Sequence, residues 1–229
     1  MVSDYHVVLV AAGEGTRLGQ RTRKAAVPLA GRPMVIHSLE AATAHPSCRS
    51  AALVVHPGDL PAAKDWLQQF DSAAVPVEIV VGGDTRRASV LAGLAAISAA
   101  GGDLVAIHDG ARPLLHPDDL ARVLDRASHS RAALLASPVT DTLHRLDRQH
   151  RWHQRVDRDQ LWQAQTPQVF ELDSIRQALS GSGAEGTDEV EAVACRGLDV
   201  EFVEPQHPNP KITTVKDLDA AEALFRRSE

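Results

Sequence analysis

The chain has 229 residues, 44% hydrophobic and 24% charged, an ordinary composition for a globular protein of one large or two small domains. Its formal charge of −6 argues against a nucleic-acid binder, whose affinity comes largely from neutralising phosphates. Its apolar runs are far shorter than the roughly 18 residues of a membrane span. With no secretory signal visible and only two widely spaced cysteines, Cys48 and Cys195, we expect a reducing, cytoplasmic location.

Short apolar runs alternate along the chain with stretches of helical periodicity. We expect strands at 6–10, 51–55, 77–81, 104–108, 132–137 and 200–203. Helices are expected between them and at the end, at 34–44, 60–70, 87–99, 117–127, 172–179 and 215–227. Strands separated by helices predict an α/β fold with a mostly parallel sheet and helices on both faces. Ligands of such sheets bind beyond the carboxyl ends of the strands.

A polar segment at about 139–165 interrupts the alternation. It has no helical apolar stripe, and it carries five arginines and three histidines: Arg145, Arg148, Arg151, Arg155, Arg158, His144, His150 and His153. We interpret it as an extended arm that leaves the domain, and a solvated surface loop remains the alternative. A nucleic-acid patch is disfavoured because Trp152 and Trp162 are the only nearby aromatic residues.

A glycine-rich turn follows the first expected strand, with the sequence Ala11-Ala12-Gly13-Glu14-Gly15-Thr16-Arg17-Leu18. Gly13 and Gly15 would let backbone N–H groups approach phosphate oxygens. Leu18 stands where a dinucleotide-binding fingerprint has its third glycine, and no Gly-Lys-Ser/Thr follows as in a P-loop. Together with Arg17 and Lys24, the turn suits a triphosphate whose leaving pyrophosphate needs cations. A tight turn with solvated charges stays open as the alternative.

Acidic residues follow two of the expected strands. Asp109 ends the fourth strand, where an α/β enzyme can hold Mg²⁺, although it could instead form the turn before Gly110. Asp84 follows the third strand and could simply cap the helix expected at 87–99. We expect His108 to be a hydrogen-bonded strand residue rather than a ligand.

Several short motifs, in order, resemble those of bacterial 2-C-methyl-D-erythritol 4-phosphate cytidylyltransferases, and they cover nearly the whole chain: 11–24, 83–89, 108–113, 138–142, 166–168, 187–189 and 211–213. The resemblance implies that CMP is transferred from CTP to a polyol phosphate in the non-mevalonate isoprenoid pathway, with release of pyrophosphate. It also implies Mg²⁺ or another divalent cation as cofactor. The implied architecture is a Rossmann-like domain spanning 1–229, in a homodimer interlocked through an arm, with no nucleic-acid or membrane partner.

The resemblance implies a role for each site residue. Arg17 and Lys24 would be catalytic, holding the CTP phosphates and stabilising the charge that builds on them. Asp109 would bind the metal ion. The nucleotide would contact Ala11, Ala12, Gly13, Gly15, Gly83, Asp84 and Ser89. The polyol phosphate would contact Arg112, Thr142, Arg158, Thr187 and Lys211, some of them from the partner subunit.

The chain departs from the family pattern just before Lys24, where Arg23 stands in place of the usual proline. This change could alter the rigidity of the loop, because proline would fix its backbone. Ribitol 5-phosphate cytidylyltransferase shares most of the motifs and is the nearest alternative. A non-catalytic nucleotide-binding protein is the second, although it would have little use for all four charged residues present here: Arg17, Lys24, Asp109 and Lys211.

Overall fold

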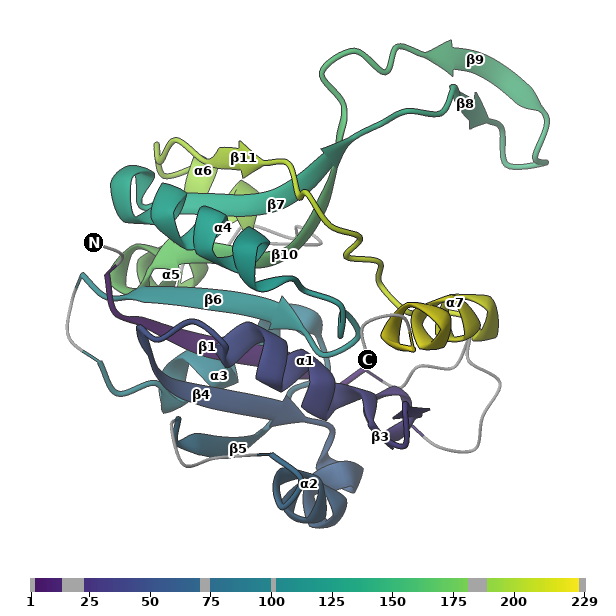
Figure 1. Cartoon of the computed structure of the whole chain (residues 1–229). Coiled ribbons are helices and arrows are strands. Elements are labelled where there is room, and N and C mark those ends of the chain that lie inside the picture. Colours follow the sequence, from purple (N-terminus) through teal and green to yellow (C-terminus); the bar gives the residue numbers. More distant parts are fainter. Residues whose placement is uncertain (1–2, 14–22, 71–74, 100–101, 181–188, 227–229) are drawn as a thin grey trace.

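A twisted seven-stranded sheet organises the computed structural model, which describes residues 3–13, 23–70, 75–99, 102–180 and 189–226 (Figure 1). The strand order is β11-β7-β10-β6-β1-β4-β5. The bounds are β1 (Tyr5–Ala11), β4 (Cys48–Val55), β5 (Val77–Val81), β6 (Leu104–Asp109), β7 (Ala132–Pro138), β10 (Trp162–Glu171) and β11 (Glu201–Val203). All pairings are parallel except those of β10, which runs antiparallel to both β6 and β7.

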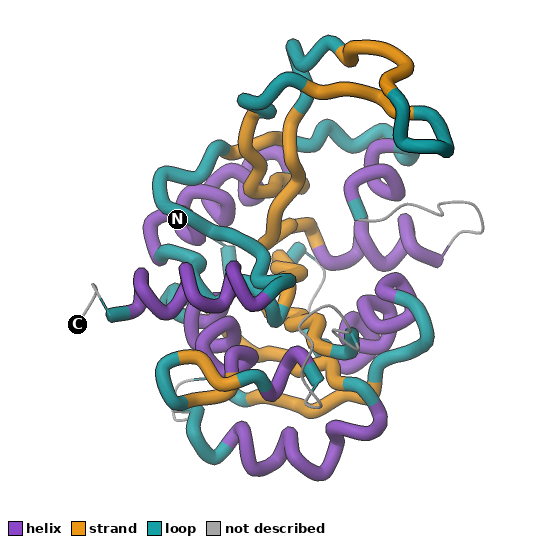
Figure 2. Tube along the Cα trace, turned by 90° about the vertical axis from the view of Figure 1, so that its right-hand side faces the viewer, coloured by secondary structure: helices purple, strands orange, loops and turns teal. Residues whose placement is uncertain are grey.

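Alternate residues of the strands enter two separate cores on the two faces of the sheet. On β1, Val7 and Leu9 belong to one buried cluster and Val8 to the other, as the two-residue period of a strand requires. The first face is covered by α1 (Met34–Thr43), α2 (Leu60–Leu67) and α4 (Pro117–Ser130). The second is covered by α3 (Arg86–Ala96), α5 (Leu172–Ser180) and α6 (Val190–Ala194). Helices lie on either side of the strands in Figure 2, which confirms the predicted α/β architecture.

A third, smaller core lies beyond the carboxyl ends of the central strands. Helix α7 (Val215–Phe225) packs there against the short strand β2 (Pro28–Leu29), which pairs with β3 (Arg32–Pro33). The helix begins in a capping box, in which Thr214 and Asp217 each accept a backbone hydrogen bond from the other. Two 3-10 turns, η2 (Lys24–Ala26) and η3 (Pro57–Asp59), face the same end of the sheet.

Strand β10 was absent from our sequence-based prediction. Its sequence lacks a continuous apolar run, and it contains Pro167, which cannot donate to a sheet ladder. The register shift between Ala164 and Gln168 coincides with this proline. The sheet is therefore mixed, and β6 and β7 are not neighbours. The short elements α6, β2 and β3 were also not predicted, because each has only two to five residues.

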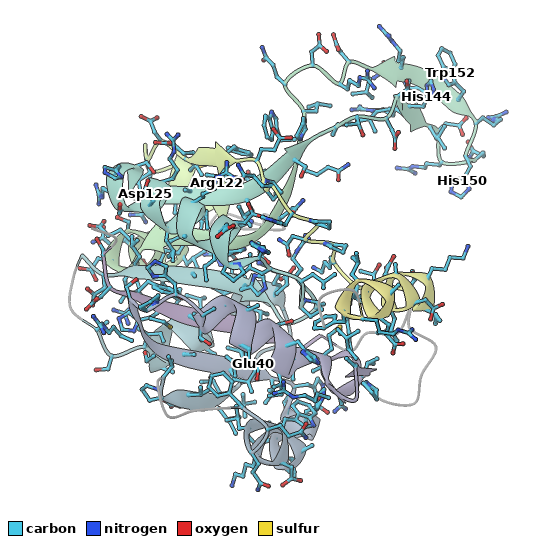
Figure 3. The ribbon with its side chains drawn as sticks, in the orientation of Figure 1. Glu40, Arg122, Asp125, His144, His150 and Trp152 are labelled. Atoms are coloured by element: carbon cyan, nitrogen blue, oxygen red, sulfur yellow. The ribbon has the colours of Figure 1, made fainter. Side chains whose placement is uncertain are left out.

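The segment between β7 and β10 projects from the body of the protein as a β-hairpin, β8 (Leu143–Leu146) and β9 (Trp152–Val156) (Figure 1). This confirms the predicted protruding arm, although its expected end at 165 overlaps the first residues of β10. Figure 3 places His144, His150 and Trp152 on this hairpin, well away from the sheet. The helices of the described residues include none with both the length and the apolar character that a membrane crossing requires.

Candidate active site

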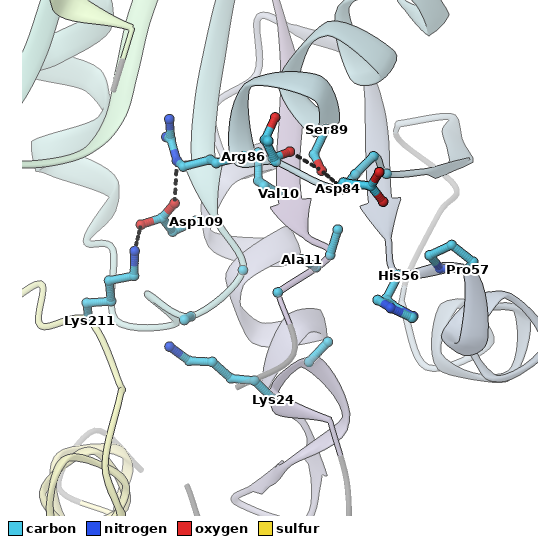
Figure 4. A pocket seen from close by; sticks show the side chains of 18 residues that line it. Val10, Ala11, Lys24, His56, Pro57, Asp84, Arg86, Ser89, Asp109 and Lys211 are labelled. Carbon is cyan, nitrogen blue, oxygen red and sulfur yellow. Dashed lines mark hydrogen bonds and ion pairs between the residues drawn. The ribbon is translucent and has the colours of Figure 1, made fainter. Parts of the chain in front are cut away.

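A cavity of about 620 Å³ opens at the carboxyl ends of β1, β4, β5 and β6 (Figure 4). Its walls are the turn after each of these strands, together with η2 and the segment before α7. The predicted site residues that line it are Ala11, Ala12, Gly13, Lys24, Gly83, Asp84, Ser89, Asp109 and Lys211. Residues scattered over 200 positions of sequence therefore meet in one pocket.

The other predicted site residues are not among those that line the cavity in the described part of the chain. Gly15, Arg17 and Thr187 fall in 14–22 and 181–188, outside the described residues. Thr142 and Arg158 are exposed residues of the arm, where the Arg158 guanidinium donates to the Thr140 carbonyl, and they do not line this cavity.

Arg112, predicted to contact the polyol phosphate, does not line the cavity. The residue as a whole is 8% exposed, and its Nη1 donates a hydrogen bond to the carbonyl of Asn209 at 2.6 Å. Asn209 in turn donates from its side chain to the Thr166 carbonyl of β10 at 2.8 Å. Arg112 therefore anchors Asn209, and with it the segment that reaches Lys211 two residues later.

Three cations surround the carboxylate of Asp109. Lys211 Nζ lies 2.8 Å from its Oδ2, and the Nε atoms of Arg86 and Arg112 lie 3.8 Å from Oδ1 and Oδ2. Burial alone would raise the pKa of Asp109, but Lys211, Arg86 and Arg112 outweigh it and hold that pKa below its usual value. The carboxylate is therefore ionised at neutral pH, with a dense positive field around it.

Sequence reasoning missed the ion pair between Arg86 and Glu189. Arg86 is the first residue of α3 and lines the cavity, and its Nη1 lies 2.6 and 2.7 Å from the two carboxylate oxygens of Glu189. Glu189 is only 2% exposed, so this charge is paired rather than solvated. The available signal was that both residues lie in the family motifs at 83–89 and 187–189. Their pairing across 103 positions, however, has no local signature.

His108 has the structural role that we predicted. It is fully buried, and its Nε2 lies 3.0 Å from the Arg112 carbonyl while its Nδ1 lies 3.1 Å from Thr166 Oγ1. Because a carbonyl can only accept, Nε2 donates and Nδ1 accepts from the threonine hydroxyl. Burial lowers the pKa of His108 to about 4, so the ring is neutral at physiological pH. Thr166 also accepts from the backbone N–H of Asp109 at 3.1 Å, which links β10 to the metal-binding candidate.

The wall formed by 82–89 depends on close packing at Gly82. A Cβ at this glycine would lie 2.6 Å from the Ala12 Cβ and 2.8 Å from Ser89 Oγ, so only glycine fits between the two turns. Thr85, not Asp84, caps α3, because its hydroxyl accepts from Ala88 N at 3.0 Å. The alternative that Asp84 is merely a helix cap is wrong, and this exposed carboxylate instead lines the cavity.

A family model described as 2-C-methyl-D-erythritol 4-phosphate cytidylyltransferase matches residues 5–227. The chain belongs to this family. A curated 2-C-methyl-D-erythritol 4-phosphate cytidylyltransferase of Stenotrophomonas maltophilia (strain R551-3) is 39% identical, with 96% of each chain covered. The protein of the same name from Azoarcus sp. (strain BH72) is 40% identical, over 96% of this chain and 94% of the relative.

Solved structures of the cytidylyltransferase family share the fold. The Thermus thermophilus enzyme matches with a TM-score of 0.78 and 31% identity, over 99% of this chain and 100% of the other. The 4-diphosphocytidyl-2C-methyl-D-erythritol synthase of Anaerococcus prevotii DSM 20548 matches with a TM-score of 0.82 and 25% identity, over 98% and 97%. The chain is therefore an enzyme, a nucleotidyltransferase of the cytidylyltransferase class, and the non-catalytic alternative is wrong.

Proposed function

We propose that the cavity binds CTP beside 2-C-methyl-D-erythritol 4-phosphate and transfers CMP between them, releasing pyrophosphate and forming 4-diphosphocytidyl-2-C-methyl-D-erythritol. One observation carries the proposal: Lys24, Asp109 and Lys211 converge on the cavity beside the start of the glycine turn at Gly13. Its volume of about 620 Å³ lies within the range of small-molecule sites, about 300–1,000 Å³. The reaction belongs to the non-mevalonate isoprenoid pathway that the family serves.

The nucleotide would lie along the ends of β1 and β5. Gly13 and Lys24 would contact its phosphates, with Arg17 adding a second cation from outside the described residues. Gly83, Asp84 and Ser89 would surround the ribose and base. The polyol phosphate would then bind near Lys211, which lines the cavity beside Asp109.

The side chain of Asp109 fits a divalent cation. Its oxygens are hard ligands, it is ionised, and it faces the cavity where phosphates would gather, while Mg²⁺ commonly uses one or two carboxylates plus phosphates. A bound Mg²⁺ would neutralise charge on the phosphates. Lys211, now 2.8 Å from Asp109, would be available to the polyol phosphate once its carboxylate partner is otherwise occupied.

The chemistry asks the protein for orientation and charge neutralisation. An oxygen of the polyol phosphate forms a bond to the α-phosphorus of CTP as the bond to the pyrophosphate oxygen breaks. This nucleophile is already an anion at neutral pH, so no general base is needed, and the neutral His108 ring is engaged with Arg112 and Thr166. Lys24 would stabilise the charge developing on the leaving pyrophosphate.

The direct test is an assay of pyrophosphate release by the wild-type enzyme. With CTP, we expect 2-C-methyl-D-erythritol 4-phosphate to support turnover far above that with ribitol 5-phosphate. Faster turnover with ribitol 5-phosphate would overturn the substrate assignment and leave cytidylyl transfer intact. Turnover with neither acceptor would contradict the proposed reaction itself.

The arm supports a homodimer in which each subunit completes the site of its partner. The arm and its base expose large apolar side chains that a single chain leaves uncovered: Leu146 at 49%, Trp152 at 67%, Leu161 at 37% and Trp162 at 40%. Such exposure is typical of an interface. Thr142 and Arg158, which the family resemblance assigns to the polyol phosphate, lie on the same arm and do not line the cavity of their own chain. The arm at about 139–165 is thus proposed to deliver them to a second copy of the 1–229 domain.

A mixed dimer tests this arrangement. Lys24→Ala and Arg158→Ala subunits, each inactive as homodimers, are mixed and allowed to exchange, with exchange verified by native mass spectrometry. In a mixed dimer one site would carry both lesions and the other neither. Random pairing makes about half the dimers mixed, so about a quarter of wild-type activity should return. If exchange occurs and activity stays near zero, Arg158 serves its own subunit and the shared site is refuted.

A further inference from the structure

Arg23 ties the segment that carries Lys24 to a second wall of the cavity. Its Nη1 donates a hydrogen bond to Asp59 Oδ1 at 3.2 Å. Asp59 ends the 3-10 turn η3, and His56 and Pro57 at the start of that turn line the cavity together with Lys24. Figure 4 shows Lys24 and the His56–Pro57 pair on separate stretches of chain around the cavity. A single ion pair therefore joins two of its walls.

Gly58 leaves the room that this contact needs. A Cβ at this position would lie 2.3 Å from Arg23 Nη1 and 2.9 Å from Nη2, so the guanidinium rests directly against the backbone of the turn. The turn itself is held by hydrogen bonds from Gly58 N to His56 Nδ1 at 3.0 Å and from Asp59 N to the His56 carbonyl at 2.9 Å. Any side chain at residue 58 would displace the arginine.

The pair is more shielded than an ordinary surface ion pair. The Asp59 side chain is 11% exposed and that of Arg23 is 35% exposed. Asp59 Oδ2 is buried and accepts no hydrogen bond from the described residues. Exposed pairs contribute about 0–1 kcal/mol, whereas a buried carboxylate that loses its cation is disfavoured. Asp59 therefore restrains the side chain of Arg23 more than an exposed partner would.

This restraint acts one residue away from Lys24. Arg23 is the residue before η2, with φ −62° and ψ 151°, and Lys24 is the first residue of the turn. Electrostatic stabilisation of a leaving group depends on where the cation lies, and a misplacement of about 1 Å can cost roughly 10²-fold in rate. A contact that fixes Arg23 therefore also limits where the backbone of Lys24 can lie.

We propose that Arg23 is a positioning residue, which together with Asp59 and Gly58 holds Lys24 in its working place. The inference rests on the proposed function of Lys24 in neutralising the leaving pyrophosphate. The φ of Arg23 is close to the value that a proline ring imposes. The Arg23–Asp59 pair therefore restrains through a side chain the same backbone that the family's usual proline restrains covalently, and this accounts for the departure at residue 23.

Three substitutions break the contact in different ways: Arg23→Ala, Asp59→Asn and Gly58→Ala. The last keeps both charges and only displaces the flexible guanidinium. Each should lower kcat by roughly tenfold while changing KM for CTP much less, because a misplaced Lys24 weakens a contact that is strongest in the transition state. Arg23→Pro removes the charge but restrains φ, and it should restore most of the lost kcat. Arg49→Ala, which removes an exposed pair with Asp4, is the matched control and should leave kcat unchanged.

The readout specific to positioning is a double-mutant cycle with Lys24→Ala. In that background, Arg23→Ala should have no further effect on kcat, since there is no lysine left to misplace. The proposal would be overturned if Asp59→Asn and Gly58→Ala both kept full kcat while Arg23→Ala lost activity that Arg23→Pro did not restore. That pattern would show that the charge of Arg23 acts directly. A Lys24→Ala enzyme with wild-type kcat would instead remove the role of Lys24, and the inference with it. Melting temperatures of all variants separate these outcomes from loss of folding.

Discussion

Replacing Asp109 by asparagine keeps the shape of the side chain and removes the charge that three cations surround. Losing one partner of a buried ion pair commonly costs about 3–5 kcal/mol. Here the cost is smaller, because the Lys211 side chain is 43% exposed and can turn into solvent, and Arg86 keeps its pair with Glu189. Arg112, whose side chain is only 10% exposed, is the cation most affected. We expect Asp109→Asn to lower the free energy of unfolding by about 1–3 kcal/mol, which corresponds to roughly 2–12 °C in Tm for a chain of this length.

The loss of activity should be much larger than the loss of stability. Turnover should fall to background, and the response to added Mg²⁺ should disappear, because the amide no longer attracts the cation. Thermal denaturation and pyrophosphate release across a Mg²⁺ titration measure the two effects. Asp4→Asn, at an exposed carboxylate paired with Arg49, should change neither. An Asp109→Asn enzyme that responds to Mg²⁺ with the wild-type midpoint would place the metal ligand elsewhere, with Asp84 the next candidate.

Three further outcomes are expected. The pKa of His108 is about 4 in the folded protein, against an ordinary value of 6.5. The unfolded chain therefore takes up this proton at a higher pH than the folded one, and the free energy of unfolding of the wild-type protein should fall as pH drops from about 6.5 to 4. His108→Gln should flatten that slope in denaturation curves by up to about 1.4 kcal/mol per pH unit, and an unchanged slope would contradict the burial argument. The pKa of Asp217 is lowered to about 2 by hydrogen bonds from Thr213. Asp217→Ala should therefore lower the free energy of unfolding, measured by urea denaturation, by about 1 kcal/mol above pH 4, and the difference from the wild-type protein should vanish as pH falls toward 2. The kcat/KM for CTP should exceed that for UTP by at least about tenfold, since hydrogen-bond partners near Ser89 would be left unpaired by uracil, and equal values would refute a cytosine-specific pocket.

Much of the fold was predictable because its strands and helices have strong local periodicity. The apolar runs that became β1, β4, β5 and β6 were recognised within a residue or two at most ends. Strand β10 could not be, because its buried half owes its pairing to the neighbours β6 and β7 rather than to its own pattern. The hydrogen bonds of Thr166, on this strand, with His108 and with the backbone of Asp109 could therefore not be predicted from the sequence.

The site was predictable where its chemistry is local and not where it depends on pairing. Gly13, Lys24 and Asp109 each follow directly from a strand or its turn, so their convergence is a consequence of parallel strands ending at one edge. The contacts of Arg23 with Asp59, and of Arg86 with Glu189, join residues 36 and 103 positions apart. Charges of either sign are common in this chain, and only the folded geometry selects which of them meet.

The most direct test of the account is the turnover of Lys24→Ala with CTP and 2-C-methyl-D-erythritol 4-phosphate. Lys24 lines the cavity beside the turn at Gly13, and its contribution should appear when charge develops on the leaving pyrophosphate. We predict a loss of roughly 10²-fold or more in kcat with little change in melting temperature. A kcat equal to that of the wild-type enzyme would contradict the assignment of this cavity as the place where CMP is transferred.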